Sequence, residues 1–187
     1  MGSLISCKSS TEPSPNYNYF PLTKGSNWHY YGDVAFARTV TGDTIVGGKT
    51  YAIIEQTGYS PGRNYYRKDG NIIYSLLPDT MNILRDVVYI NPANGASGAY
   101  STLTFKGASE KIVTNVRWAD TKQHFRDTTY GKPYADVMIV HIRSVVQYHD
   151  TSFSITEGDY YYADGVGMVD QITSGGGTAE LTNYEIK

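Results

Sequence analysis

The sequence has very little cysteine: Cys7 is the only one among 187 residues. A single cysteine excludes an internal disulfide framework and a zinc site built on several cysteines. Long apolar runs are also missing, since no stretch approaches the ~20 residues that a membrane-spanning helix needs. An excess of positive charge is missing too: 16 Lys and Arg stand against 18 Asp and Glu, a formal net charge of −2. This balance excludes nucleic acid as a predicted partner, because binding its phosphate backbone requires a basic face.

Helical periodicity is a further absence, because no segment repeats its apolar residues every 3.6 positions. The chain instead has 18 Tyr against 5 Phe and 2 Trp, together with 19 Gly. Tyrosine, valine, isoleucine and threonine favour strands, and tyrosine suits positions that are apolar at the base and wet at the tip. The sequence therefore predicts an all-β fold.

Tight turns separate many of the predicted strands. Gly47-Gly48 and Asp69-Gly70 each lie between two β-rich runs, and such pairs are typical of two-residue hairpins. Residues 91–99 form the longest predicted loop, and residues 119–132 are polar enough to hold a short helix or an irregular crossing. Ten or so strands in an open flat sheet are unusual. We therefore predict a strongly curved antiparallel meander sheet, half-barrel or barrel-like, with at most one short helix; a β-sandwich is the alternative.

The longest predicted strand begins near residue 137. Met138, Val140 and Ile142 alternate with His141 and Arg143, which predicts one buried side and one side that is solvated at its centre. A weak internal similarity precedes it: the sequence GKPYADV at 131–137 resembles GKTYAII at 48–54. Two halves of similar plan would explain the similarity, although seven residues are little evidence of a repeat.

The residues before Cys7, Leu-Ile-Ser, resemble a bacterial lipobox, in which the cysteine receives diacylglycerol and becomes the mature N-terminus. Residues 8–18 are polar, contain two prolines and show no periodicity, as a flexible tether would. The predicted organisation is a signal-peptide remnant and lipobox over 1–7, a tether over 8–18 and a single all-β domain over 19–187. The basic start and apolar core of a signal peptide are not in the sequence. Whether Met1-Gly2-Ser3 is native or an expression remnant stays open.

A second pattern overlaps the first. The start MGSLIS also fits N-myristoylation of Gly2, with Ser6 in place, and Cys7 would then be palmitoylated. Both interpretations give a lipid anchor at this end, and the alternative to both is a chance match. The Tyr- and Gly-rich β domain favours the bacterial one. Lys8, rather than Asp, follows Cys7, which by analogy with the sorting of Gram-negative lipoproteins predicts the outer membrane.

Two glycine motifs match catalytic or nucleotide-binding patterns only in part. The sequence GYSPG at 58–62 matches a nucleophile elbow, but Pro61 has no N–H to donate to an oxyanion. A loop between two strands is the better prediction. The sequence GVGMVD at 165–170 lacks the third glycine of a dinucleotide fingerprint and no helix follows, so a kinked strand or bulge is predicted there.

The remaining candidates for chemistry have no spacing that fixes a mechanism. The four histidines, His29, His124, His141 and His149, do not form a metal-binding motif. Asp159 and Asp164, with Glu157, are candidates for calcium binding or for a carboxylate pair of a hydrolase, but turn chemistry explains them as well. We expect no catalytic residue, no metal and no cofactor.

Tyrosine clusters at 30–31, 65–66 and 160–162 are the best candidates for binding. Consecutive strand residues face opposite sides of a sheet, so each cluster places at least one ring outside the core. Tyr31, Tyr66 and Tyr161 are the candidate ligand-binding residues. Cross-strand aromatic packing is the simpler explanation of the same clusters, and the pattern favours it.

Three stretches together resemble a family of uncharacterised bacterial envelope lipoproteins that carry a domain of unknown function. Residues 19–32, YFPLTKGSNWHYYG, resemble its opening F-P-L-x-x-G-x-x-W-x-Y. Residues 131–142, GKPYADVMIVHI, resemble its mid-domain strand. Residues 160–172, YYYADGVGMVDQI, resemble its closing Y-Y-A-x-G-V-G-x-V. The resemblance implies a curved-sheet fold in the cell envelope and no assigned activity.

Four residues match recurring positions of that family: Trp28, Tyr30, Gly165 and Gly167. The resemblance implies structural roles for them, as a core ring, a hairpin partner and bulge glycines. The leading functional hypothesis is a lipid-anchored envelope protein that binds a glycan, a lipid or a partner protein and catalyses nothing. A structural module of an envelope assembly is the alternative, and a carboxylate-based hydrolase is the third hypothesis.

Overall fold

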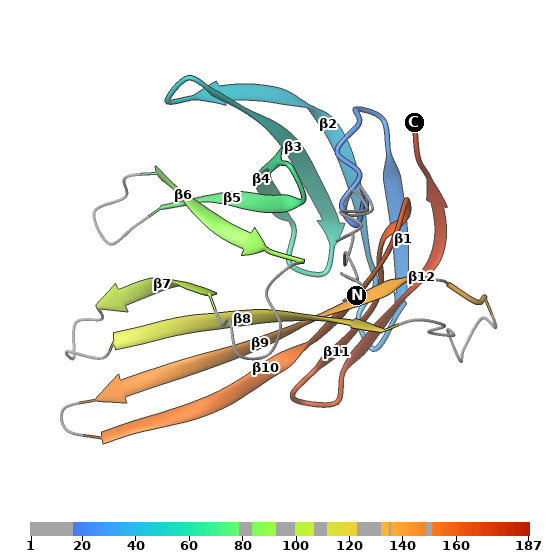
Figure 1. Ribbon diagram of the computed structural model, residues 1–187. Coiled ribbons are helices and arrows are strands. Elements are labelled where there is room, and N and C mark those ends of the chain that lie inside the picture. Colours follow the sequence, from blue (N-terminus) through green and yellow to red (C-terminus); the bar gives the residue numbers. More distant parts are fainter. Residues whose placement is uncertain are drawn as a thin grey trace, which may run out of the picture.

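The computed structural model describes residues 17–78, 84–92, 100–106, 112–122, 132–134, 136–148 and 151–187. These residues form twelve strands and no helix, so none of them belongs to a helix that could cross a membrane. The strands are β1 (Asn27–Gly32), β2 (Phe36–Val46), β3 (Lys49–Gly58), β4 (Gly62–Asp69), β5 (Ile72–Pro78), β6 (Leu84–Ile90), β7 (Tyr100–Lys106), β8 (Ile112–Lys122), β9 (Val137–Tyr148), β10 (Thr151–Ala163), β11 (Gly167–Thr173) and β12 (Thr178–Glu185) (Figure 1). The all-β prediction is confirmed. Cys7 and residues 8–16 lie outside the described residues.

All twelve strands belong to one antiparallel sheet with the order β6-β5-β4-β3-β2-β1-β12-β11-β10-β9-β8-β7. Each strand pairs with its neighbours in the chain, except that β1 pairs with β12 and that β6 and β7 form the two edges. The sheet curls until the edge strands β6 and β7 come close to each other without pairing (Figure 1). This is the predicted curved meander, and the two packed sheets of the alternative are not formed.

The predicted glycine turns lie where the strands reverse. Gly47 and Gly48 connect β2 to β3 with φ angles of +58° and +75°, as the two central residues of a tight hairpin turn require. Gly70, with φ of +58°, follows β4 at the turn into β5. The residues from Gly58 to Gly62 form the loop between β3 and β4, and a strand rather than a helix follows them. The loop that was predicted here in place of a nucleophile elbow is therefore confirmed.

Bulges bend the sheet into its curved form. The register shifts between Val40 and Gly42 in β2 and between Thr156 and Gly158 in β10. A bulge bends its strand and increases the local twist. Gly158 has φ of +153°, and a Cβ there would lie 2.5 Å from the backbone oxygen of Ile172. This position in β10 therefore has room for glycine alone.

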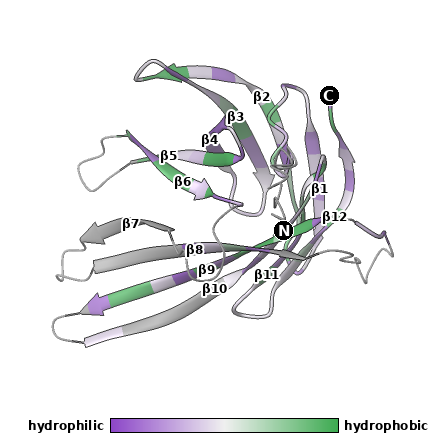
Figure 2. Ribbon diagram, in the orientation of Figure 1, coloured by the Kyte–Doolittle hydropathy of each residue, from purple (hydrophilic) through white to green (hydrophobic). Residues whose placement is uncertain are grey.

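The core lies on the concave side of the sheet, where one buried cluster draws on almost every strand. Along β9 the predicted alternation is confirmed, because Met138, Val140 and Ile142 are buried while Arg143 on the other side is exposed. Figure 2 shows hydrophobic and hydrophilic residues along the same strands, as a curved sheet with one packed face requires. Other members of the cluster are Trp28, Phe36, Val40, Ile54, Tyr66, Ile73, Ile90, Ala119, Tyr162, Met168, Ala179 and Leu181.

Trp28 joins the first strand to the turn between β10 and β11. Its ring is 5% exposed, and its Nε1 donates a hydrogen bond of 2.6 Å to the backbone oxygen of Val166. Gly167, with φ of +102°, leaves space for that ring, since a Cβ there would lie 3.1 Å from Trp28 Nε1. Tyr30 pairs with Phe36 across the β1–β2 hairpin and stacks on it at 4.5 Å. Trp28 and Tyr30 thus take the expected roles of core ring and hairpin partner. Gly167 was expected in a bulge but instead makes room for the Trp28 ring, and the register shift of this hairpin lies between Tyr161 and Tyr162.

The described chain begins two residues before the predicted domain. Tyr17, which we assigned to the tether, stacks on Tyr19 with ring centroids 5.2 Å apart. The backbone N–H of Asn18 donates to Asp164 at 2.5 Å, and Gly165 N–H donates to the backbone oxygen of Asn18 at 3.0 Å. These bonds attach residues 17 and 18 to the β10–β11 turn.

Two other sequence observations have a place in this topology. A short helix or an irregular crossing was predicted over 119–132. The first part of this range, as far as Lys122, belongs to strand β8, and residues 123–131 lie outside the described residues. The two similar stretches of sequence lead into β3 and β9. These are the third strands of β1–β6 and of β7–β12, the two meanders that meet at the β1–β12 pair.

Candidate functional site

The concave side of the sheet holds a cleft of about 340 Å³. Strands β2, β3, β4, β5, β6, β8, β9, β10 and β11 all contribute to its walls. One part of its lining is apolar or aromatic: Phe36, Tyr59, Tyr66, Leu77, Tyr89, Ile142 and Tyr160. The other part is polar: Arg38, Gln56, Ser60, Asn64, Ser75, Arg117 and Gln171. The lining therefore combines apolar surface with two positive charges, and none of these residues is an aspartate or a glutamate.

Arg38 enters the cleft from β2, between the inward residues Phe36 and Val40. Its Nε donates a hydrogen bond of 2.8 Å to Gln56 Oε1, on the paired strand β3. Its guanidinium carbon lies 5.0 Å from the ring centroid of Phe36 and 5.8 Å from that of Tyr30, within the range of cation–π contacts. Arg38 is thus held by an amide and two aromatic rings.

Arg117 enters the cleft from β8, beside Ile142 of the paired strand β9. Its guanidinium carbon lies 4.4 Å from the ring centroid of Tyr89. The Nε of Arg117 is buried and has no hydrogen-bond partner among the described atoms. A buried donor without an acceptor is unfavourable, so this side of the cleft lacks an acceptor.

Three tyrosine hydroxyls form a network between the two arginines. The hydroxyls of Tyr66 and Tyr162 are hydrogen-bonded to that of Tyr89, whose ring lies edge-on to Tyr66 at 4.9 Å. Burial alone would raise the pKa of the Tyr89 phenol, but the charges of Arg117 and Arg38 and the two hydrogen bonds outweigh burial and lower it. Burial raises the pKa of Tyr66 and of Tyr162. Both positive charges therefore act on the same buried phenol.

The N-terminal segment closes one end of the concave side. Phe20 packs against Tyr66, Tyr162 and Tyr89, with ring centroids 4.9, 5.9 and 6.0 Å apart. A second hollow, between Phe20 and Trp28, has a volume of only about 20 Å³. This is room for about one water molecule, so the larger cleft is the candidate binding site.

The three tyrosines predicted to bind a ligand are not brought together. Tyr66 is 8% exposed and lines the cleft. Tyr31 is 63% exposed on the outer side of β1. Tyr161 lies half-buried on the outer side of β10, opposite the inward-facing Tyr160 and Tyr162. Two of the three tyrosine clusters, on β4 and β10, lie on strands that line the cleft, where Tyr160 rather than Tyr161 faces it; the third cluster, on β1, does not line it.

The candidate carboxylates also lie apart. Asp159 forms a hydrogen bond of 2.7 Å with His141 Nδ1, and His141 stacks on Trp118 at 5.2 Å. Asp164 lies in the β10–β11 turn, where it accepts the Asn18 N–H. Over the part of the chain that the structure describes, no three His, Cys, Asp or Glu residues gather as a metal site would require. The structure thus gives both aspartates partners of their own and does not pair them.

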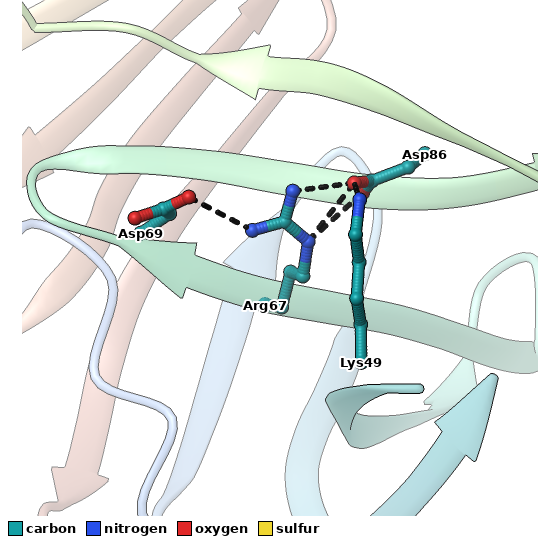
Figure 3. Close-up of polar contacts among 4 residues, drawn as sticks. All are labelled: Lys49, Arg67, Asp69 and Asp86. Atoms are coloured by element: carbon teal, nitrogen blue, oxygen red, sulfur yellow. Dashed lines mark hydrogen bonds and ion pairs between the residues drawn. The ribbon is translucent and has the colours of Figure 1, made fainter. Parts of the chain in front are cut away.

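A group of ion pairs lies on the outer side of the sheet, around Arg67 of β4 (Figure 3). Arg67 Nε donates to Asp86 Oδ2 of β6 at 3.0 Å, Lys49 Nζ lies 2.7 Å from the same oxygen, and Arg67 also contacts Asp69. Burial alone would raise the pKa of Asp86, but the hydrogen bonds from Arg67 and Lys49 outweigh it and hold that pKa below its usual value. The group connects β3, β4 and β6, and each of its two cations is paired with a carboxylate of the group. We therefore interpret it as stabilising the sheet and not as a ligand-binding site.

Comparisons with known proteins identify the fold. No protein-family model matches the sequence, and no curated protein matches it either. Two solved structures share the fold over 90% of this chain and 99% of their own chains, each with a TM-score of 0.50. One is described as a "putative lipoprotein" from Parabacteroides distasonis, at 16% sequence identity. The other is described as a "putative exported protein" with a YmcC-like fold from Bacteroides fragilis, at 10% identity. At these identities the similarity shows the fold alone.

Proposed function

We propose that this protein is a lipid-anchored protein of the bacterial cell envelope that binds a small ligand with an apolar body on the concave side of its sheet. The observation that carries the proposal is the cleft of about 340 Å³, which is within the usual size range of ligand pockets. Its mixture of aromatic walls and a few converging polar groups is also typical of such pockets. We propose no catalysis, because no carboxylate lines the cleft among the described residues.

The envelope part of the proposal has two supports. The sequence Leu-Ile-Ser-Cys resembles a lipobox, and two solved structures with this fold are described as a lipoprotein and an exported protein. Lys8 after the cysteine supports the outer membrane as the location. A palmitate-bearing anchor at Cys7, followed by the tether, would hold the domain near the membrane surface.

The cleft favours a lipid-like ligand over the other two ligand classes of the sequence analysis. A glycan needs several flat aromatic faces open to solvent. The rings of Tyr66 and Tyr89 pack against each other and against Phe20, although Tyr59 in the loop after β3 is 61% exposed. A protein partner needs a broad exposed patch, whereas this site is concave. A structural role in an envelope assembly remains the alternative and predicts that the cleft binds nothing.

Filling the cleft tests the proposal. Asn64 is half-buried in the cleft wall, so Asn64→Trp places a large ring in the space that a ligand would use. We expect the native domain to bind the neutral apolar dye Nile red with increased fluorescence, and Asn64→Trp to weaken binding about tenfold or more, since a filled site loses apolar contact area. Tyr65→Trp is the matched control, because it introduces the same ring on the outer side of the same strand. Equal dye binding by both variants, or none by the native domain, would contradict the proposal.

The anchor has its own test. We expect the protein expressed behind a full bacterial signal peptide to incorporate labelled palmitate and to sediment with membranes. Cys7→Ser removes the thiol that carries the lipid, so both properties should be lost while the domain stays folded. Palmitate incorporation that survives Cys7→Ser would show that the anchor lies elsewhere, and no incorporation by the native protein would show that there is none.

A further inference from the structure

The two arginines of the cleft differ from those of the outer surface. On the outer side, Arg63 pairs with Glu55 at 2.7 Å, and Arg67 pairs with Asp86. Neither Arg38 nor Arg117 forms an ion pair with any carboxylate that the structure describes. On the outer side, Arg63 and Arg67 thus have carboxylate partners, whereas the groups around the two cleft arginines are aromatic rings, an amide and a thioether.

Two positive charges in an enclosed aromatic site are unfavourable without an anion. A charge removed from water is stable only when it is paired and hydrogen-bonded. Aromatic faces compensate a guanidinium in part, but they do not accept its hydrogen bonds in the plane of the group. The buried Nε of Arg117, which lacks an acceptor, shows what is missing.

Arg38 also has N–H groups that could donate hydrogen bonds to a ligand. Its Nε is occupied by Gln56, but one terminal nitrogen has only the sulfur of Met168, at 3.7 Å. A carboxylate or phosphate can take two parallel N–H bonds from one guanidinium. Both arginines line the same cleft, and Arg117 lies over Tyr89, whose ring packs against Tyr66 of the same lining.

We propose that the cleft binds an amphipathic acid, with its carboxylate or phosphate held by Arg38 and Arg117 and its apolar part against Phe36, Leu77 and Ile142. The inference rests on the proposed function and names the chemical class of its ligand. Fatty acids and phospholipids share this chemistry, because each combines an anionic group with an apolar chain.

A pair of ligands tests the inference on the native domain, with no variant needed. Decanoate and decanol have the same chain and differ in the anionic group. We expect decanoate to displace Nile red at a concentration at least about tenfold lower than decanol, because hydrogen bonds to a charged group contribute about this much to affinity. Decyl phosphate, which has the same chain length, distinguishes the two sources: tighter binding than decanoate indicates a phospholipid head group, and weaker binding indicates a fatty acid.

Variants assign the preference to its residues. Arg117→Gln should weaken decanoate binding about tenfold or more and leave decanol binding unchanged, and Arg117→Lys should restore part of the loss, since it keeps the charge. Arg143→Gln is the matched control. It removes the same charge from the outer, exposed side of β9, next to the inward-facing Ile142. Circular dichroism and thermal unfolding confirm that each variant is folded.

The outcomes separate this inference from the proposed function. If Nile red binds but the native domain does not prefer decanoate over decanol, the ligand is not an acid and only this inference fails. Equal weakening of both ligands by Arg117→Gln, or the same loss with Arg143→Gln, also overturns it. If Nile red, decanoate and decanol all fail to bind, the proposed function fails with it.

Discussion

Replacing Trp28 with alanine is expected to lower the free energy of unfolding by about 3–5 kcal/mol, the usual cost of removing a buried aromatic ring. The ring is 5% exposed, and its Nε1 donates to the backbone oxygen of Val166. It joins β1 to the β10–β11 turn and so connects the first part of the chain to the last. Urea unfolding followed by circular dichroism measures the change.

Two further substitutions separate the contribution of the buried Trp28 ring to stability from that of its hydrogen bond. Trp28→Phe keeps most of the buried area but leaves the Val166 oxygen without its donor, so we expect a loss of about 1–3 kcal/mol. Trp118→Ala is the control, because Trp118 is half-buried on the outer side, where it stacks on His141. It should lower stability by about 1 kcal/mol, as an average substitution does. If Trp28→Ala costs no more than Trp118→Ala, the structural role of Trp28 is wrong.

Stability should also fall steeply above pH 10. Burial raises the pKa of Tyr30, Tyr66 and Tyr162 above the usual value of a phenol, and burial, with Tyr17 and Asp164 nearby, raises the pKa of Tyr19 to about 12. In the unfolded chain these phenols ionise near pH 10. Their contribution to stability is therefore complete below pH 10. It is lost as the pH rises toward the folded pKa values, because the unfolded state then binds fewer protons than the folded state.

The size of this effect follows from the number of buried phenols. Each contributes a slope of ~1.4 kcal/mol per pH unit, so Tyr19, Tyr30, Tyr66 and Tyr162 together give ~5 kcal/mol per pH unit above pH 10. Urea midpoints between pH 8 and pH 11.5 measure the slope, and absorbance at 295 nm reports ionisation. Tyr66→Phe should reduce the slope, while Tyr31→Phe, at a position that is 63% exposed, should leave it unchanged. A flat profile from pH 9 to pH 11 would contradict the burial of these hydroxyls.

The fold was predictable because its determinants are local. Glycine pairs such as Gly47-Gly48 mark hairpins within a few residues, and the alternation around Val140 assigns one side of β9 to the core. Local patterns of this kind predict strands and tight turns, and a meander is a series of strands joined by such turns. The pairing of β1 with β12 joins residues that are far apart in the chain and was not visible in any local pattern.

The candidate site was less predictable, for two physical reasons. In a pair such as Tyr65-Tyr66 both residues are alike, so alternation does not say which one faces inward. Tyr161, the candidate chosen from 160–162, lies on the outer side of β10. The second reason is distance along the chain, because Arg38 and Arg117 come to line one cleft only through the curling of the sheet. The position of Arg38, between the inward-facing Phe36 and Val40, was the signal that the sequence did contain.

The position of β1 beside β12 has a consequence for the order of folding. Strands β2 to β6 can add to β1 one hairpin at a time, and each addition closes a short loop. The other side of β1 must wait for the last strand, since Asn27 pairs with Glu185. Contacts between such distant residues are slow to form. A nascent chain that ends before β12 therefore holds two separate meanders, each with a bare edge, and only the final strand turns them into one sheet with an enclosed side.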